Sequence, residues 1–183
     1  MKFAVSLIVF WIPFSKLRKQ MRMKLLYWIY SLRVTRKAKR VGIGLRVGGV
    51  SSVTRFTEIG DNVTLNGVDI TGDGKVVIGS NTKIGTDTHI ISQSHNYESD
   101  KLPYGDDYIL KDVIIGECVW IGFRTIVLPG AKIGDGAIIQ AGSVVHGEIP
   151  SCAIAGGNPV KVFAWRDKGR YEKLRKESSY IKW

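Results

Sequence analysis

The sequence predicts an all-β solenoid, a parallel β-helix, from three observations. First, an aliphatic residue recurs at every sixth position in three runs: Val41, Val47, Val53, Ile59 and Leu65; Ile78, Ile84 and Ile90; Ile115, Ile121, Val127, Ile133, Ile139 and Val145. Second, the residue after the aliphatic is often glycine, and third, the residue four positions later is usually small or β-branched. A period of six is neither helical nor a simple alternation. It fits a short strand with two inward side chains, followed by a tight corner.

Three such hexads close one triangular turn, and stacked turns place the aliphatic side chains in one continuous core. Gly60-Asp61-Asn62 and Gly79-Ser80-Asn81 are expected at corners, because these residue types tolerate a positive φ. We expect the β-helix over residues 41–160 and a basic, partly amphipathic helical segment over 1–40. A C-terminal helical tail is expected over 161–183, packed as a short basic helix on a neighbouring subunit.

The six-residue spacing fails at two places. Leu65 and Ile78 are 13 residues apart, one more than two hexads, and the turn-rich Gly72-Asp73-Gly74 is expected to hold the extra residue. Ile90 and Ile115 are 25 residues apart, so that 19 extra residues must leave the solenoid as a loop over about 93–111. Long excursions from a rigid scaffold are often functional.

Charge is unevenly distributed along the chain, whose formal net charge is +11. Residues 1–57 carry 13 Lys or Arg and no acid, residues 58–160 carry six against 13, and residues 161–183 carry eight against three. The solenoid lacks the basic surface with interleaved aromatics that is typical of nucleic-acid binding, so no nucleic-acid partner is expected. Two cysteines, Cys118 and Cys152, without metal or disulfide spacing favour a reducing cytoplasm.

The basic N-terminal segment has two interpretations. Residues 4–14 are apolar but too few to span a membrane, and a helix is expected from about Ser15 to Leu32. Its apolar stripe consists of Leu17, Met21, Leu25, Trp28 and Leu32. The stripe could close the open first turn of the solenoid, or the basic helix could lie on an anionic membrane surface at the inner face of the membrane. The two interpretations are compatible.

The C-terminal repeats carry a resemblance to a known family. They read IIGECVWIGFRTIVLPGAKIGDGAIIQAGSVV, followed by GNPVK, and resemble the hexapeptide-repeat acyltransferases. The similarity is strongest to galactoside, maltose and xenobiotic O-acetyltransferases and their polysaccharide-modifying relatives, and it extends over about residues 41–165. The resemblance implies a left-handed β-helix, an exception to the usual right-handed crossover. It also implies a homotrimer that holds acetyl-coenzyme A, the acyl donor, between neighbouring subunits.

In that family, a histidine at the start of the projecting loop is the catalytic base, and His95 occupies this place in the sequence SQSHN. Acyl transfer from a thioester to a hydroxyl or amine needs a base that takes the acceptor's proton. Imidazole suits this role, since its ordinary pKa is about 6.5. The transfer is expected to be direct, without a covalent acyl-enzyme.

The same resemblance implies residues that contact the coenzyme and the acceptor. The coenzyme contacts are expected at Trp120, Phe123, Ala141, His146, Gly147 and Lys161. Trp120 is expected near the acceptor and the pantetheine arm, and Lys161 near the nucleotide phosphates. Asn66 and Asp73 align loosely with acceptor-binding residues. Because the acid-free N-terminal segment differs from the galactoside and maltose enzymes, we expect the acceptor to be a sugar of a cell-envelope glycan.

Two other function classes stay open. A metal hydratase like the γ-class carbonic anhydrases would need converging histidines, whereas His89 and His95 are one hexad apart and are expected to diverge. His146 lies 51 residues beyond His95, and no metal is expected. A non-catalytic scaffold or binding β-helix would need neither His95 nor the loop.

Overall fold

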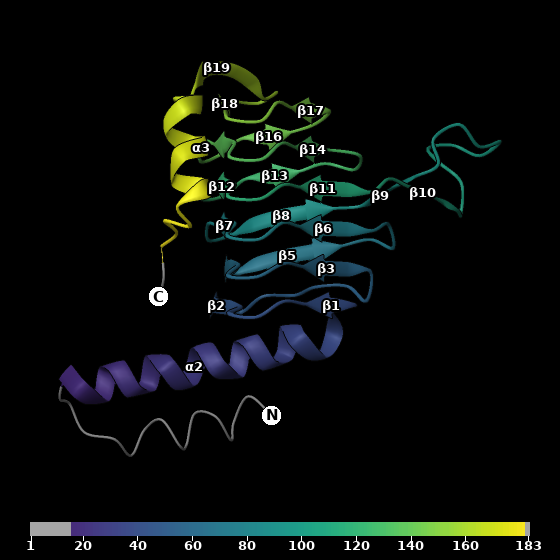
Figure 1. Ribbon diagram of the computed structural model, residues 1–183. Coiled ribbons are helices and arrows are strands. Elements are labelled where there is room, and N and C mark those ends of the chain that lie inside the picture. The colour runs from purple at the N-terminus through teal and green to yellow at the C-terminus, as the bar shows by residue number, and fades with distance from the viewer. Residues whose placement is uncertain (1–15, 182–183) are drawn as a thin grey trace.

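The protein is described by a computed structural model that defines residues 16–181 (Figure 1). Its body is a parallel β-helix with a helix across its N-terminal end, a hairpin that projects from its side and a short helix along one edge. The predicted fold class is therefore confirmed, with a helix on each flank. The helical tail expected over 161–183 is wrong at its start, because residues 161–165 form a strand and the helix covers only 168–176. The apolar stretch 4–14, the helix start expected at Ser15 and the side chain of Leu17 lie outside the described residues.

The described strands form three faces, which we name A, B and C. Face A contains β1 (Arg40–Val41), β3 (Thr57–Ile59), β6 (Val76–Ile78), β11 (Val113–Ile115), β14 (Lys132–Ile133) and β17 (Glu148–Ile149). Face B contains β2 (Arg46–Gly49), β4 (Thr64–Asn66), β7 (Lys83–Ile84), β12 (Trp120–Ile121), β15 (Ile138–Ile139), β18 (Ala153–Gly156) and the antiparallel β19 (Lys161–Trp165). Face C contains β5 (Val68–Thr71), β8 (Thr88–Ile91), β13 (Ile126–Val127) and β16 (Val144–Val145).

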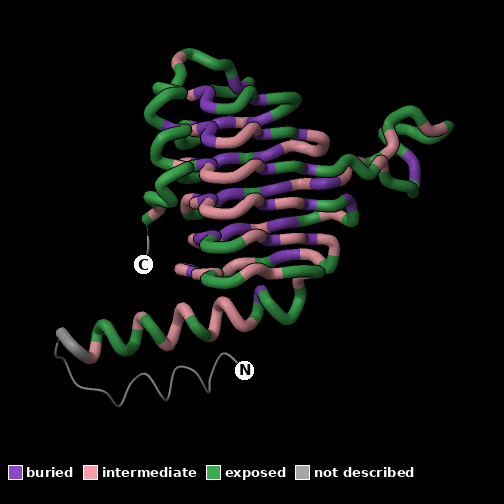
Figure 2. Tube along the Cα trace, in the orientation of Figure 1, coloured by how far each residue is buried: buried purple, intermediate pink, exposed green. Residues whose placement is uncertain are grey.

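The hexad aliphatics form the core along the axis of the solenoid (Figure 2). Each lies in register with its equivalent in the next turn, as Ile121 does with Ile139 and Val127 with Val145. These four side chains are fully buried. Successive side chains of a strand point to opposite sides, so each aliphatic points into the core and its two neighbours point out. The spacing therefore determines which side chains face inward.

The irregular spacing between Leu65 and Ile78 combines two compensating changes. Ile70 pairs with Ile90 and takes the inward position of its turn, five residues after Leu65 and eight before Ile78. Compared with a regular hexad, the corner after β4 therefore has one residue fewer, and the corner at Gly72-Asp73-Gly74 has two residues more. The predicted insertion at this corner is confirmed, and Gly72 has a φ of +98° there.

The second irregularity produces the projecting loop (Figure 1). Strands β9 (Gln93–His95) and β10 (Tyr108–Leu110) pair antiparallel as a hairpin between β8 and β11. The chain re-enters the solenoid at β11, whose residues pair with β6 below and β14 above. The hairpin matches the loop predicted over about 93–111, and its strands give it a fixed root.

Helix α2 (Lys16–Lys37) covers the first turn of the solenoid (Figure 1). Val34 is 1% exposed, and the Ser31 hydroxyl accepts a hydrogen bond from the Val47 N–H at 3.2 Å. Met21 and Trp28 of the predicted stripe are instead 60% and 62% exposed. The capping interpretation is right for the helix and wrong for Met21 and Trp28, whereas Leu25 and Leu32 of the stripe are half-buried.

No helix within residues 16–181 has the length and apolar character that crossing a membrane requires.

Helix α3 (Lys168–Lys176) lies along the edge between faces A and B of its own chain. The Arg175 guanidinium contacts the Glu117 carboxylate at 3.2 Å, and a Cβ atom on Gly136 would lie only 2.7 Å from Tyr171 Cε2. The helix thus packs on its own solenoid, and the expected packing on a neighbouring subunit stays a prediction. Arg175 of the helix pairs with acidic side chains of the solenoid, and the Tyr171 ring packs against the corner at Gly136.

Candidate functional site

Four of the residues singled out from the sequence lie along one edge of the solenoid. We call it the CA edge, the corners that connect face C to face A. It carries Asp73, the hairpin with His95, and the turn His146-Gly147. The corners stack directly, since the Asp73 N–H donates to Gln93 Oε1 at 2.9 Å. Successive turns of the solenoid thus bring these residues to the same side of the molecule.

His95 is held by aromatic rings of its own hairpin. It is the cross-strand partner of Tyr108, and its ring stacks on Tyr104 with centroids 3.8 Å apart and an interplanar angle of 17°. The Tyr108 ring lies 4.9 Å from it, tilted by 35°. Within the described part of the chain, His95 forms no ion pair or hydrogen bond through its ring. Both ring nitrogens are thus available to an acceptor.

Backbone and side-chain hydrogen bonds fix the hairpin that carries His95. The Asn96 Nδ2 group donates to Asp107 Oδ2 at 3.0 Å, and the Gly105 N–H donates to the Asn96 carbonyl at 2.9 Å. The Asn96 N–H donates to the Asp107 carbonyl at 3.2 Å. Since these bonds join both arms of the loop next to His95, they set the position of the imidazole relative to the solenoid.

A second group of predicted residues lies along the BC edge, the corners that connect face B to face C. Phe123 and Ala141 occupy corners of successive turns, and the Gly142 N–H donates to the Phe123 carbonyl at 2.8 Å. Asn66 ends β4, and the turn of β7 lies between it and the turn of Phe123. Lys161 pairs with Gly156 at the upper end of the same edge. Ala141 is exposed, so its surroundings leave room for an extended ligand along the edge.

Face C separates these two groups within one chain. The structure brings Asp73, His95, His146 and Gly147 to one side of face C, and Asn66, Phe123, Ala141 and Lys161 to the other. A single protomer therefore does not assemble all the predicted site residues around His95.

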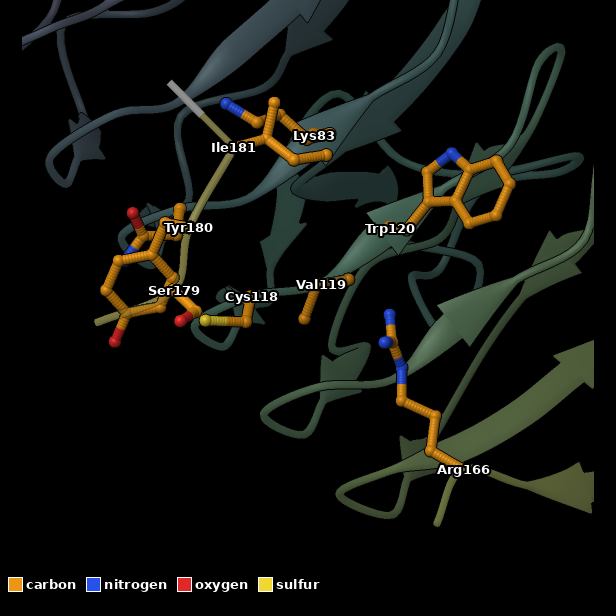
Figure 3. A pocket seen from close by; sticks show the side chains of 9 residues that line it. Lys83, Cys118, Val119, Trp120, Arg166, Ser179, Tyr180 and Ile181 are labelled. Atoms are coloured by element: carbon orange, nitrogen blue, oxygen red, sulfur yellow. The ribbon is translucent and has the colours of Figure 1, made fainter. Parts of the chain in front are cut away.

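Trp120 projects from face B and is 56% exposed. Beside it lies a half-open cavity of about 450 Å³ (Figure 3). Its lining residues are Asn81, Lys83, Cys118, Val119, Trp120, Arg166, Ser179, Tyr180 and Ile181. The C-terminal segment after α3 forms one wall, and the strands of face B form the other. Burial raises the pKa of the Cys118 thiol, which disfavours a nucleophilic role.

The other histidines are arranged differently from His95. His89 projects from face C and lies 3.7 Å from an Asp69 carboxylate oxygen and 3.9 Å from one of Asp87. His89 and His95 diverge as expected, one on face C and the other on the hairpin. Among the described residues, no group of three or more His, Cys, Asp or Glu side chains is arranged to hold a metal ion.

Sequence reasoning missed the neighbours of two predicted residues. Tyr104 and Tyr108 contact His95 through the hairpin, whose register is not part of the hexad pattern. Lys83 lies next to Trp120 in register, and this pair could have been found because both residues directly precede a hexad aliphatic. Arg166 reaches the same cavity from β19, which lies beyond the repeats.

Comparisons with known proteins show what the repeats are similar to. Residues 112–147 match the family model described as bacterial transferase hexapeptide, six repeats. YvoF of Bacillus subtilis is 38% identical over 110 residues, which are 60% of this chain and 59% of the relative. Galactoside O-acetyltransferase of Escherichia coli K12 is 34% identical over 127 residues, 67% of this chain and 62% of the relative. The chain thus spans less than two thirds of the length of these relatives.

A solved structure supports the fold. The hexapeptide-repeat acetyltransferase VCA0836 of Vibrio cholerae, complexed with acetyl-coenzyme A, superposes with a TM-score of 0.66 at 22% identity. The superposition covers 88% of this chain and 83% of that one. The chain therefore has the left-handed parallel β-helix fold, and its residues 112–147 match the hexapeptide-repeat model.

Proposed function

We propose that the protein transfers an acetyl group from acetyl-coenzyme A to a hydroxyl, or an amine, of a sugar, with His95 as general base. The observation that carries this proposal is the single long interruption of a hexapeptide-repeat solenoid, which presents His95 on a rigid hairpin. The similarity to a galactoside O-acetyltransferase supports the sugar acceptor, and the coenzyme complex of VCA0836 supports the donor.

In the proposed reaction, an acceptor oxygen attacks the carbonyl carbon of the thioester. Its proton passes to a free ring nitrogen of His95, and the bond from that carbon to sulfur breaks. The coenzyme leaves as a thiolate, which is protonated to the free thiol. Tyr104 and Tyr108 would hold the imidazole plane during these steps, because their rings contact it directly. No covalent enzyme intermediate and no metal are required.

The proposed assembly is a homotrimer in which face C lies toward the threefold axis. In this arrangement the CA edge of one protomer would lie beside the BC edge of the next, which would unite the two groups of predicted residues. Outward-facing Ile126 and Val144 lie side by side on face C and offer it an apolar contact. The acetyl-coenzyme A would then lie between subunits, along Phe123 and Ala141 of one and beside His146 and Gly147 of its neighbour.

The proposal also places the protein in the cytoplasm at an anionic membrane face, where it would modify a cell-envelope glycan. Residues 1–57 carry 13 cations and no acid, and Met21 and Trp28 are exposed on α2. Apolar side chains bordered by Lys and Arg suit the headgroup region of such a membrane.

Thiol release from acetyl-coenzyme A tests the proposed activity. We expect release that depends on the presence of a sugar in a panel of neutral and charged acceptors. The rate should fall by at least about 100-fold in His95→Ala, because a positioned general base contributes roughly this much or more. Equal acceptor-dependent rates for both proteins would contradict the assignment. A His95→Ala protein with the wild-type circular dichroism spectrum would exclude misfolding as the cause of a loss, and wild-type protein inert toward every acceptor would favour a scaffold.

A further inference from the structure

The cavity beside Trp120 carries positive charge without a compensating acid. Lys83 and Arg166 line it, and none of its described lining residues is Asp or Glu. Its volume of about 450 Å³ lies in the range of small-ligand sites. The cavity therefore favours an anionic ligand.

Lys83 and Trp120 form the face B side of the cavity. They are direct register partners on β7 and β12 and project outward side by side. The Lys83 ammonium donates to the Asn62 carbonyl at 2.9 Å and to Thr64 Oγ1 at 3.0 Å, both neutral acceptors. Burial, and then the nearby Arg46 guanidinium, lower the pKa of Lys83. An anion in the cavity would offset both effects, because it would stabilise the charged ammonium.

Arg166 supplies a second cation from the opposite side. Its backbone N–H is fixed to the Cys152 carbonyl at 2.8 Å, and its side chain extends toward Val119 and Trp120 (Figure 3). The Arg166 Nε atom is buried and has no hydrogen-bond partner within residues 16–181. A buried guanidinium N–H without an acceptor is costly, and a phosphate or carboxylate oxygen would satisfy it.

We infer that this cavity binds the phosphate of a phosphorylated sugar, with the sugar ring packed on the indole of Trp120. The planar guanidinium of Arg166 and the ammonium of Lys83 suit the oxygens of a phosphate, and the exposed indole suits the apolar C–H face of a sugar ring. The cavity lies on face B, apart from His95 on the CA edge of the same protomer, so acetylation of the bound sugar rests on the proposed function and its proposed trimer. The assignment narrows the acceptor class from sugars in general to sugar phosphates.

Isothermal titration calorimetry of the full chain with α-D-glucose 1-phosphate tests the binding site. Lys83→Met and Arg166→Gln should each weaken binding by about tenfold or more, since each removes a charge-assisted contact to the phosphate. Lys132→Met and Arg170→Gln serve as matched controls on face A and on α3, and they should bind like the wild type. Equal affinity in the cavity variants and the wild type would overturn the inference, as would wild-type protein that does not bind.

Two further experiments distinguish a sugar phosphate from the phosphates of coenzyme A, and ligand binding from acetyl transfer. Glucose 1-phosphate should still bind when coenzyme A is saturating, whereas displacement would assign the cavity to the phosphates of the coenzyme and overturn the inference. Glucose without phosphate should bind at least about tenfold more weakly; equal binding would overturn it. Because calorimetry needs no acetyl donor, cavity-dependent binding of glucose 1-phosphate, without thiol release for any acceptor in the panel, would uphold the inference for the ligand and contradict the proposed reaction alone.

Discussion

His95 differs from the other histidines in what its ring contacts. His89 lies near the carboxylates of Asp69 and Asp87, whereas the His95 ring lies on Tyr104 and beside Tyr108. The sequence alone singled out His95 because the hexad pattern breaks there and because of the family resemblance. It could not reveal the two tyrosines, since the register of an antiparallel hairpin depends on turn geometry within the loop. The candidate histidine was thus predictable, and the rings that hold it were not.

Substitution of Tyr104 tests this support. Tyr104→Ala should lower kcat by about 10- to 100-fold with a smaller change in KM, because a displaced base loses alignment with the acceptor. Tyr104→Phe keeps the stacked ring and should retain most of the activity. Steady-state kinetics with both substrates distinguish these outcomes. Equal kcat in Tyr104→Ala and the wild type would show that stacking does not position His95.

Cys118 offers a second prediction at this scale. Burial raises the pKa of its thiol above the ordinary value, so that less reactive thiolate is present at any pH below it. In a Cys152→Ser background, we expect Cys118 of the native protein to react with a thiol reagent at pH 8 at least about tenfold more slowly than in denaturant. Tyr171→Ala should accelerate the native reaction, because Tyr171 of α3 is buried against this corner. Similar rates in the native and denatured states would contradict the raised pKa of Cys118.

At the scale of elements, α2 has two separate roles on two faces. Tyr30 and Val34 pack on the solenoid, whereas Met21 and Trp28 face outward. The helix and its basic character were predictable from periodicity and charge. Its orientation was not, because it depends on how the chain enters β1 rather than on where the most apolar stripe lies. The same reasoning applies to α3, whose partners Glu117 and Asp135 became visible only when the solenoid edge was known.

Two variants of α2 separate its roles. Val34→Asp should destabilise the protein by about 3 kcal/mol, because it places an unpaired carboxylate in the core, and chemical denaturation would measure this loss. The double variant Met21→Ser/Trp28→Ser should change the free energy of unfolding by less than about 0.5 kcal/mol. The same double variant should float less with anionic vesicles than the wild type does. Undiminished flotation would exclude this face as the membrane contact.

At the scale of the whole molecule, the position of a residue within its hexad determines the face or edge of the solenoid on which it lies. Periodicity predicted the inward aliphatics, the corners and the projecting loop, since each follows from position within a hexad. It did not predict that the candidate residues divide between the CA and BC edges, on either side of face C. That division depends on which corner of the triangle each hexad forms, and it motivates the proposed trimer.

The stacked turns of the solenoid should unfold cooperatively, because they share one core. Ile121 is fully buried and pairs with Ile84 below and Ile139 above. Ile121→Ala should cost about 2 to 5 kcal/mol in the free energy of unfolding, because it removes packing from three successive turns. Denaturant titration would measure this loss, and Ile138→Ala on the outer side of the next strand is the matched control. A small effect of Ile121→Ala would mean that the turns unfold independently.

Subunit complementation tests the central claim, acyl transfer at sites shared between the CA edge of one protomer and the BC edge of its neighbour. His95→Ala should be inactive for lack of a base, and Ala141→Trp should be inactive because the indole obstructs the coenzyme at the BC edge. When the two variants are co-expressed at equal levels and all trimers are purified together, about a quarter of the sites combine an intact His95 with an intact Ala141. We therefore predict acetyl transfer at about a quarter of the wild-type rate from two inactive parents. Mixed trimers as inactive as their parents would contradict the shared site.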